Sequence, residues 1–187
     1  KRLDQVFAPE FQSALFNSLM TGTVTAALTV SASLFLIHAG RMQRLRRMPL
    51  VMRLASMGYA LPGTVLAIGL LFVLGGADRW INNALKAISL PAPGLIFSGT
   101  VLAVILAATI RFMAVADSGL HSGLHKLPPN LDHAARNLGR SARQATLQVM
   151  LPLLRPAILT SLVLVFVDTV KELSATILLR PIGFNTL

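Results

Sequence analysis

The sequence predicts an all-α integral membrane protein, and three observations support this prediction. Of its 187 residues, 54% are hydrophobic and only 13% are charged, whereas an average soluble domain has about 25% charged residues. The apolar residues gather in runs of about 20, long enough to cross the roughly 30 Å hydrocarbon core of a bilayer as helices. The net charge of +10 lies mostly between these runs. The composition excludes a disordered chain, and the absence of cysteine excludes disulfides and thiolate metal sites.

The first two candidate spans carry no charged residue. The first covers about residues 13–39, and the second covers about residues 54–76. Pro62 and Gly63 lie in the first half of the second span. A proline inside a span frees a backbone carbonyl, which is tolerated where protein or water lies beside it.

The third and fourth candidate spans contain charges. The third covers about residues 94–116, and Arg111 lies close enough to its end for the guanidinium to reach the interface. The fourth covers about residues 156–179 and has three charged residues in its middle, namely Asp168, Lys171 and Glu172. Charges at such a depth normally face a bundle interior or a water-filled path.

The basic residues between the spans predict the orientation. Ten of them lie in segments 40–53 and 117–155, against five in the N-terminal flank, the 77–93 loop and the far end. Because cytoplasmic loops carry the excess of Lys and Arg, we place these two segments in the cytoplasm and both ends of the chain outside. The topology of a protein embedded in membrane lipid then explains the net positive charge, and no nucleic-acid partner is expected.

The cytoplasmic segment 117–155 predicts two short helices. Asn130 can cap a helix over residues 131–138, and Gly139 permits a sharp exit. A second helix is expected from about residue 141 to 150, followed by prolines that turn the chain back. The small side chains of the first helix would let it enter a groove on a partner, although composition alone fits a helix lying on the membrane surface equally well.

The spacing in this segment resembles the Glu-Ala-Ala loop of binding-protein-dependent ABC importer permeases. That pattern is Glu-Ala-Ala, three residues, Gly, nine residues, Ile, one residue and Leu-Pro; it is matched by His133-Ala134-Ala135, Gly139, Val149 and Leu151-Pro152. The resemblance implies a type I ABC importer transmembrane bundle whose loop docks on a separate ATPase. His133 replaces the usual Glu, and we expect the adjacent Asp132 to take over part of its polar role.

Other segments resemble the ferric-iron permease branch of this family. They are Tyr59–Gly63, Leu127–Asp132, Lys171–Thr176, Leu179–Pro181 and Gly183–Leu187. This branch often joins two homologous halves, and the chain resembles most of the C-terminal half, truncated before its last helix. The resemblance implies a permease of the bacterial inner membrane that works with an ABC ATPase dimer, a second permease half or homologous subunit, and an extracytoplasmic substrate-binding protein. Thiamine, polyamine, sulfate and molybdate permeases share the loop, so the substrate stays open.

The charges of the fourth span allow more than one interpretation. Asp168 and Glu172 are four residues apart, so both lie on one helical face, with Lys171 beside them. They could line the translocation path, or form an internal cluster in which Lys171 neutralises one acid. From a different class, an ion-gradient-driven secondary transporter would use both acids as proton or cation sites. A membrane anchor or signalling subunit without transport activity is a third interpretation.

No catalytic, cofactor or metal site is predicted. His121 and His125 have helical i, i+4 spacing, but a metal site needs further ligands that the sequence does not place. None of the four lysines follows a glycine, as the lysine of a phosphate-binding loop must. We therefore expect ATP hydrolysis in a separate subunit.

Overall fold

The computed structural model describes residues 9–42, 48–128, 131–137, 139–181, 183–184 and 186. Every regular element in these ranges is helical, which confirms the predicted all-α class. Three described helices are long and apolar enough to cross a membrane: α2 (Pro9–Met42), α4 (Gly63–Ala87) and α5 (Val101–His125). A bent pair of helices that ends with α9 (Arg155–Lys171) is a fourth candidate.

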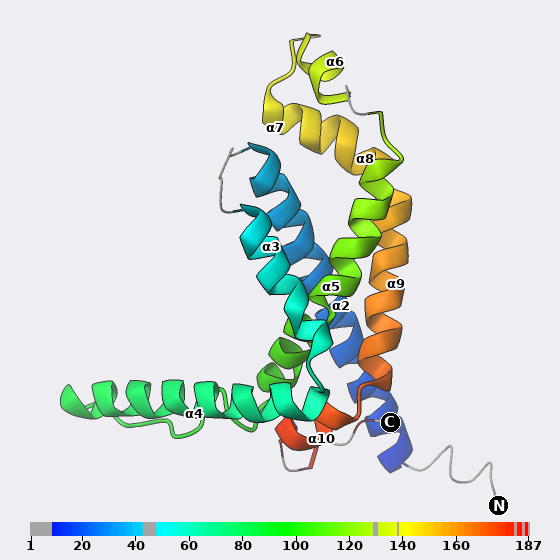
Figure 1. Cartoon of the computed structure of the whole chain (residues 1–187). Helices are drawn as coiled ribbons and strands as arrows, with labels where there is room; N and C mark the ends of the chain where they lie inside the picture. Colours follow the sequence, from blue (N-terminus) through cyan, green and yellow to red (C-terminus); the bar gives the residue numbers. More distant parts are fainter. Residues whose placement is uncertain are drawn as a thin grey trace, which may run out of the picture.

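Helices α2, α5 and α9 form a three-helix bundle (Figure 1). Its core consists of small and branched apolar side chains from all three helices, namely Ala26, Val30, Ile37, Ala108, Phe112, Ala116, Leu120 and Val165. Helix α2 also turns hydroxyl side chains towards this core. Thr21 donates a 2.7 Å hydrogen bond to the Asn17 carbonyl, and Thr29 donates one of the same length to Thr25. These two hydroxyl protons are thereby satisfied within the helix, as an apolar environment favours.

Helices α5 and α9 pack closely where both carry small residues. A Cβ atom added at Gly123 would clash with the Cβ of Ala157, and one added at Gly119 would clash with Oγ of Ser161. Two glycines four residues apart thus face two small residues four residues apart. Such pairs let helix backbones pack closely in a membrane, where lipid tails leave no hydrophobic drive for helix association.

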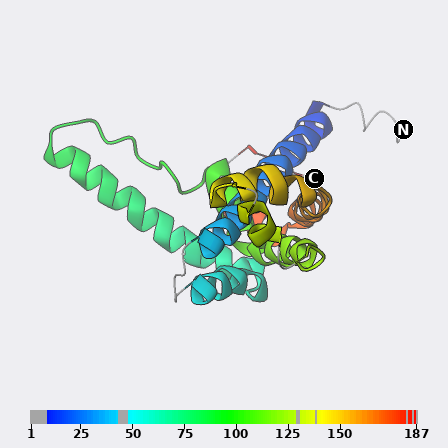
Figure 2. The same ribbon diagram turned by 90° about the horizontal axis from the view of Figure 1, so that it is seen from above.

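The predicted second span is divided at Pro62. Its first part lies in α3 (Met48–Ser56) and the 3₁₀ helix η1 (Met57–Ala60), which pack along α5, with Gly58 against the carbonyl of Ile110. Its second part lies in α4, which turns away from the bundle (Figures 1 and 2). The reason is local, because proline lacks an N–H and its ring clashes with the preceding helical turn.

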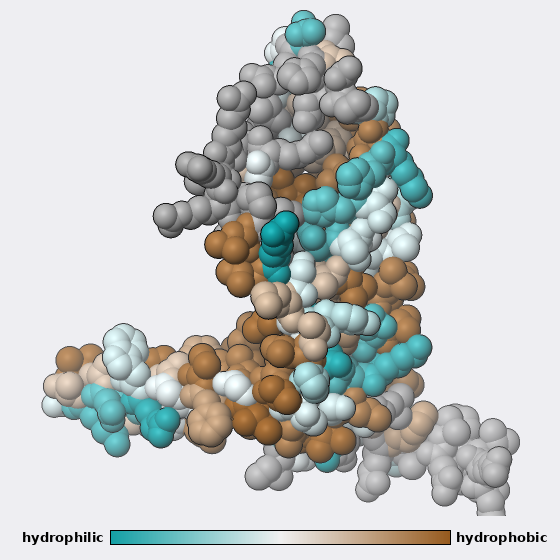
Figure 3. Space-filling model, viewed as in Figure 1, coloured by the Kyte–Doolittle hydropathy of each residue, from teal (hydrophilic) through white to brown (hydrophobic). Residues whose placement is uncertain are grey.

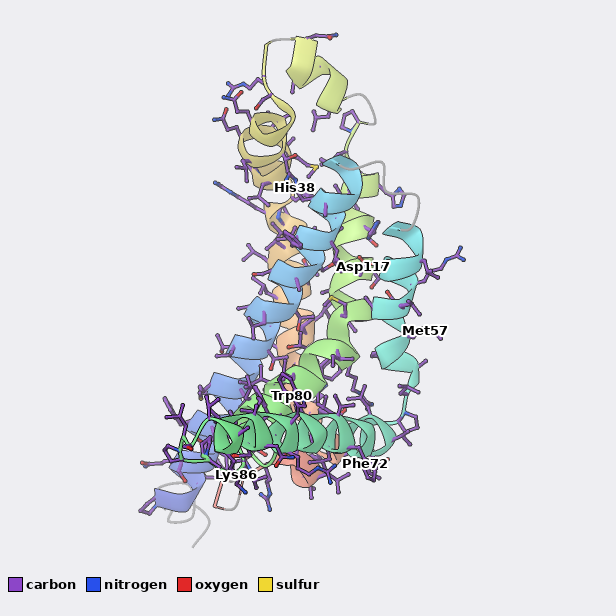
Figure 4. The ribbon with its side chains drawn as sticks, turned by 90° about the vertical axis from the view of Figure 1, so that its left-hand side faces the viewer. His38, Met57, Phe72, Trp80, Lys86 and Asp117 are labelled. Atoms are coloured by element: carbon purple, nitrogen blue, oxygen red, sulfur yellow. The ribbon has the colours of Figure 1, made fainter. Side chains whose placement is uncertain are left out.

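Helix α4 packs against the bundle through its first half. Leu66, Ala67 and Leu74 pack against α5 and against α10 (Ser174–Leu179) in a second apolar cluster. Beyond this cluster the helix extends past the bundle, with apolar residues along much of its surface (Figure 3). Phe72 and Trp80 are among the most exposed side chains described (Figure 4). This surface suits contact with lipid or with another helix.

The predicted fourth span is also divided. Helix α9 ends at Lys171, Glu172 is extended, and the chain turns into α10. The charged residues therefore lie at the end of a helix and not in the middle of one. Before α9, the chain passes through α7 (Ala142–Ala145), the π-helical η2 (Thr146–Met150) and α8 (Leu151–Leu153), and then bends by 61°.

Replacing Gly123 by alanine should destabilise the bundle by about 1–3 kcal/mol, because the added methyl group meets the fixed Cβ of Ala157. Gly69→Ala is the matched control, since nothing lies within 4 Å of that position and alanine favours a helix. Thermal unfolding of both purified variants in detergent measures the difference. Equal stability of the two variants would contradict the close packing of α5 and α9.

Candidate functional site

The predicted docking helix is α6 (Leu131–Asn137), which lies at the end of the molecule opposite α10 and the start of α2 (Figure 1). Its C-terminal end is closed by a Schellman motif: the Arg140 N–H donates a 3.2 Å hydrogen bond to the Ala135 carbonyl. Gly139 has a φ of +83°, the left-handed conformation that this motif requires. The glycine of the Glu-Ala-Ala pattern therefore fixes the exit of the chain from α6.

The helix after Gly139 begins with a capping box. The Ser141 hydroxyl accepts a 3.3 Å hydrogen bond from the Gln144 N–H, and Gln144 Oε1 accepts a 2.9 Å bond from the Ser141 N–H. The helix then runs through α7, η2 and α8 to Leu153. These two reciprocal bonds fix where the helix starts, directly after α6.

The residues of the predicted coupling loop lie in different helices and differ in exposure. On α6, Ala134 is exposed, whereas Ala135 is 7% exposed and buried against its own chain. Leu151 and Pro152 are half-buried in α8, at the other end of the helical segment. The side chains of Asp132 and His133 lie outside the described part of the chain. Only Ala134 of the Ala-Ala pair is therefore open to a partner.

Leu154 holds the bend between α8 and α9 against α5. It is 1% exposed, and its Cδ2 lies 3.4 Å from the position of a Cβ added at Gly123. Ala157, one turn later, meets the same glycine. The segment from α6 to α8 is thus connected to the bundle at the closest contact between α5 and α9.

Glu172 is neutralised by Arg111 of α5. Arg111 Nε lies 3.1 Å from Glu172 Oε2, and the Ala175 N–H donates a 3.2 Å hydrogen bond to Oε1. The two side chains are only 20% and 10% exposed. Arg111 Nε makes no aligned hydrogen bond within the described residues, so the contact is an ion pair. The expectation that Arg111 reaches the interface is wrong, because its charge is used inside the protein.

Among the described residues, the three predicted path residues do not surround an open channel. Lys171 is exposed, and Asp168 is half-buried on α9. Glu172 lines a chamber of only about 10 Å³ with hydroxyl residues of three helices, including Thr21, Thr169 and Thr176. This space holds about one water molecule. The described residues hold no group of three or more His, Cys, Asp or Glu that could bind a metal ion.

A buried aspartate of α4 organises the segment that leads to α5. Asp78 is 2% exposed and accepts hydrogen bonds from three successive backbone N–H groups, those of Ile96, Phe97 and Ser98, at 2.9–3.2 Å. One turn later, Asn82 bonds both backbone groups of Gly94. Neither residue is predicted as a site from the sequence, where the available signal is an aspartate followed four residues later by an asparagine on an apolar helix.

The family model and the individual relatives that match this chain all describe components of transport systems. The model of the family described as "Binding-protein-dependent transport system inner membrane component" matches residues 32–186. The chain is 27% identical over 178 residues to the Fe(3+)-transport system permease protein FbpB 2 of Haemophilus influenzae. These residues are 95% of this chain and 32% of the relative. It is 24% identical over 166 residues to the ferric transport system permease protein FbpB of Actinobacillus pleuropneumoniae, covering 89% and 22%.

A further relative has a different described substrate. The putative 2-aminoethylphosphonate transport system permease protein PhnV of Salmonella typhimurium is 31% identical over 90 residues, covering 48% of this chain and 34% of the relative. The chain therefore spans about a third or less of the length of the curated relatives it matches.

Arg111→Met should destabilise the protein by about 3–5 kcal/mol, because it leaves the Glu172 carboxylate buried without a counter-charge. Adding Glu172→Gln should recover much of this loss. Lys171→Met, at an exposed neighbouring charge, is the control and should change stability by less than about 0.5 kcal/mol. Unfolding of the single and double variants in detergent measures the coupling, and strictly additive effects would contradict the ion pair.

Proposed function

The chain belongs to the binding-protein-dependent transport system inner membrane component family, and from this we propose that it is the membrane-spanning permease part of an ATP-driven importer. Members of this family are transporter subunits and not catalytic enzymes, and the apolar helices agree with a multi-pass membrane protein. An ABC ATPase dimer, a second permease half and an external substrate-binding protein supply the remaining functions. The α6 end faces the cytoplasm, because the basic segments lie there, and the opposite end faces outward.

The observation that carries this proposal is the shape and position of α6. It lies beyond the spanning helices, its end is fixed by the Schellman motif at Gly139, and its exposed Ala134 leaves room for close approach of another surface. A short helix entering a cleft on a partner is an established mode of recognition. We expect the cleft to belong to the ATPase.

The connection from α6 to the bundle supplies a path for the motion. A displacement of α6 passes through the helix of α7, η2 and α8 to the bend at Leu154, which is held against Gly123. From there α9 leads to Glu172, whose ion pair with Arg111 links it to α5 beside the start of α4. Closure of the ATPase would then move α9 against its neighbours as a rigid body. This motion would open the translocation path alternately to the two sides of the membrane.

Ferric iron is the substrate that the relatives favour. The two ferric transport permeases match 95% and 89% of the chain, whereas the aminoethylphosphonate permease matches 48%. The ion-gradient alternative has less support, because the Glu172 carboxylate already has the Arg111 guanidinium as its counter-charge.

ATP-dependent uptake of ferric iron by the full transporter in proteoliposomes tests this function. We expect uptake to require the ATPase subunit and to persist when an ionophore dissipates the proton gradient. Uptake that continues without the ATPase and stops with the ionophore would overturn the proposal in favour of a secondary transporter. Uptake of another solute, with the same ATP dependence, would overturn only the choice of iron.

Substitutions in α6 should uncouple transport without preventing insertion. Ala134→Glu places a large carboxylate on the exposed face, and we expect a loss of ATP-dependent uptake of at least about tenfold, with Ala134→Ser as the mild control. Gly139→Val strains the left-handed position, whereas Gly139→Asn should keep activity because asparagine tolerates that conformation. Uptake and membrane abundance are measured together. Normal uptake by Ala134→Glu would count against docking through α6.

A further inference from the structure

A groove of about 570 Å³ lies between α3 with η1 on one side and α5 on the other. Figure 4 labels one residue of each wall, Met57 on η1 and Asp117 on α5. The described residues that line it are Arg53, Ser56, Met57, Ala60, Asp117 and His121. It thus combines a cation, an anion and apolar surface, and the proposed coupling between α6 and α9 uses none of these residues.

The acidic wall is held in place by two neighbours. Asp117 Oδ1 lies 3.2 Å from His121 Nδ1 and accepts a 3.3 Å hydrogen bond from the Ser33 hydroxyl of α2. The Asp117 side chain remains 22% exposed. Its second oxygen, Oδ2, has no partner among the described residues, so it can accept a hydrogen bond from a ligand.

The basic wall of the groove carries a charge that has no ion-pair partner among the described residues. Arg53 lies on α3, is exposed, and forms no ion pair within the described residues, with Asp117 or any other acid. A guanidinium is well suited to a phosphate group, because it presents several N–H donors in a planar arrangement. The Arg53 guanidinium and the Asp117 carboxylate therefore lie on separate walls of the groove, and each can bind an oppositely charged group of a ligand.

The proposed orientation places the groove near the cytoplasmic ends of the spanning helices. Asp117 is eight residues before the end of α5 at His125, which corresponds to about 12 Å along a helix. Arg53 ends the basic segment 40–53, which the proposed orientation places on the cytoplasmic side. At this depth the apolar wall of Met57 and Ala60 faces the level at which lipid tails meet headgroups.

We propose that this groove binds the headgroup of phosphatidylethanolamine. The phosphate contacts the Arg53 guanidinium, the primary ammonium donates to Asp117 Oδ2, and the glycerol and upper acyl chain lie on Met57 and Ala60. Both polar contacts are charge-assisted hydrogen bonds. Headgroup pockets between spanning helices are a known form of lipid recognition. Phosphatidylglycerol lacks the ammonium and brings only its negative charge to the Asp117 carboxylate, and phosphatidylcholine has no N–H to donate.

Lipid binding to the purified full transporter tests the assignment. Native mass spectrometry in mixed micelles would compare phosphatidylethanolamine with phosphatidylcholine and phosphatidylglycerol. We expect the first lipid to bind at least about fivefold more tightly than the other two. Arg53→Gln should weaken all three lipids, with Arg79→Gln, exposed on α4 outside the groove, as the matched control. Asp117→Asn should remove the preference over phosphatidylglycerol.

The outcomes separate the headgroup from other occupants. Equal binding of the three lipids to the unaltered protein, or unchanged lipid affinity in Arg53→Gln, would overturn the proposal. Displacement of the lipid by millimolar soluble phosphoethanolamine is expected, because the two share the same charged groups. Binding of phosphoethanolamine as tight as that of the lipid would overturn lipid as the occupant, because the glycerol and acyl chain would then add nothing to the affinity. Because Arg53 is exposed, its replacement tests the site even where Asp117→Asn impairs folding.

Discussion

The close packing of α5 against α9 is the contact on which the other features of this structure depend. Gly119 and Gly123 of α5 leave room for Ser161 and Ala157 of α9, and larger residues would separate the helices. Helix α5 also packs against α2, η1, α4 and α10, so its distance from α9 affects both apolar clusters. In a membrane, where lipid tails compete with side chains for apolar contact, this fit between small residues provides stability that hydrophobic burial does not.

Buried polar groups add a second constraint, because an apolar environment requires each of them to be satisfied. Arg111 of α5 neutralises Glu172 just where α9 ends and the chain turns into α10. Asp78 binds three backbone N–H groups and holds the segment before α5 against α4. Both arrangements involve charges on or beside apolar helices, and both fix where a helix ends or turns. They explain how a chain with broken spans keeps a defined geometry.

The proposed function and the proposed lipid site use different faces of α5. Its Gly123 face holds the bend at Leu154, through which motion of α6 reaches the bundle. Its Asp117 and His121 side chains line the groove against α3 and η1. A bound headgroup would join α3 to α5 beside the helix that moves, and so would influence how freely α5 responds. The exposed apolar surface of α4 leaves further room for lipid or for the remainder of a longer protein, since the chain spans about a third or less of its relatives.

The sequence alone determined the helical class, the apolar segments and the register of the Gly139 turn, because these depend on composition and on short-range spacing. It could not determine which charge neutralises Glu172: Lys171 is adjacent in sequence, but Arg111 is the partner in space. The exposure of Ala134 and the burial of Ala135, the divided spans, and the groove at Asp117 likewise required the tertiary structure. Each depends on which helices pack together, and that is decided by contacts between residues far apart in the chain.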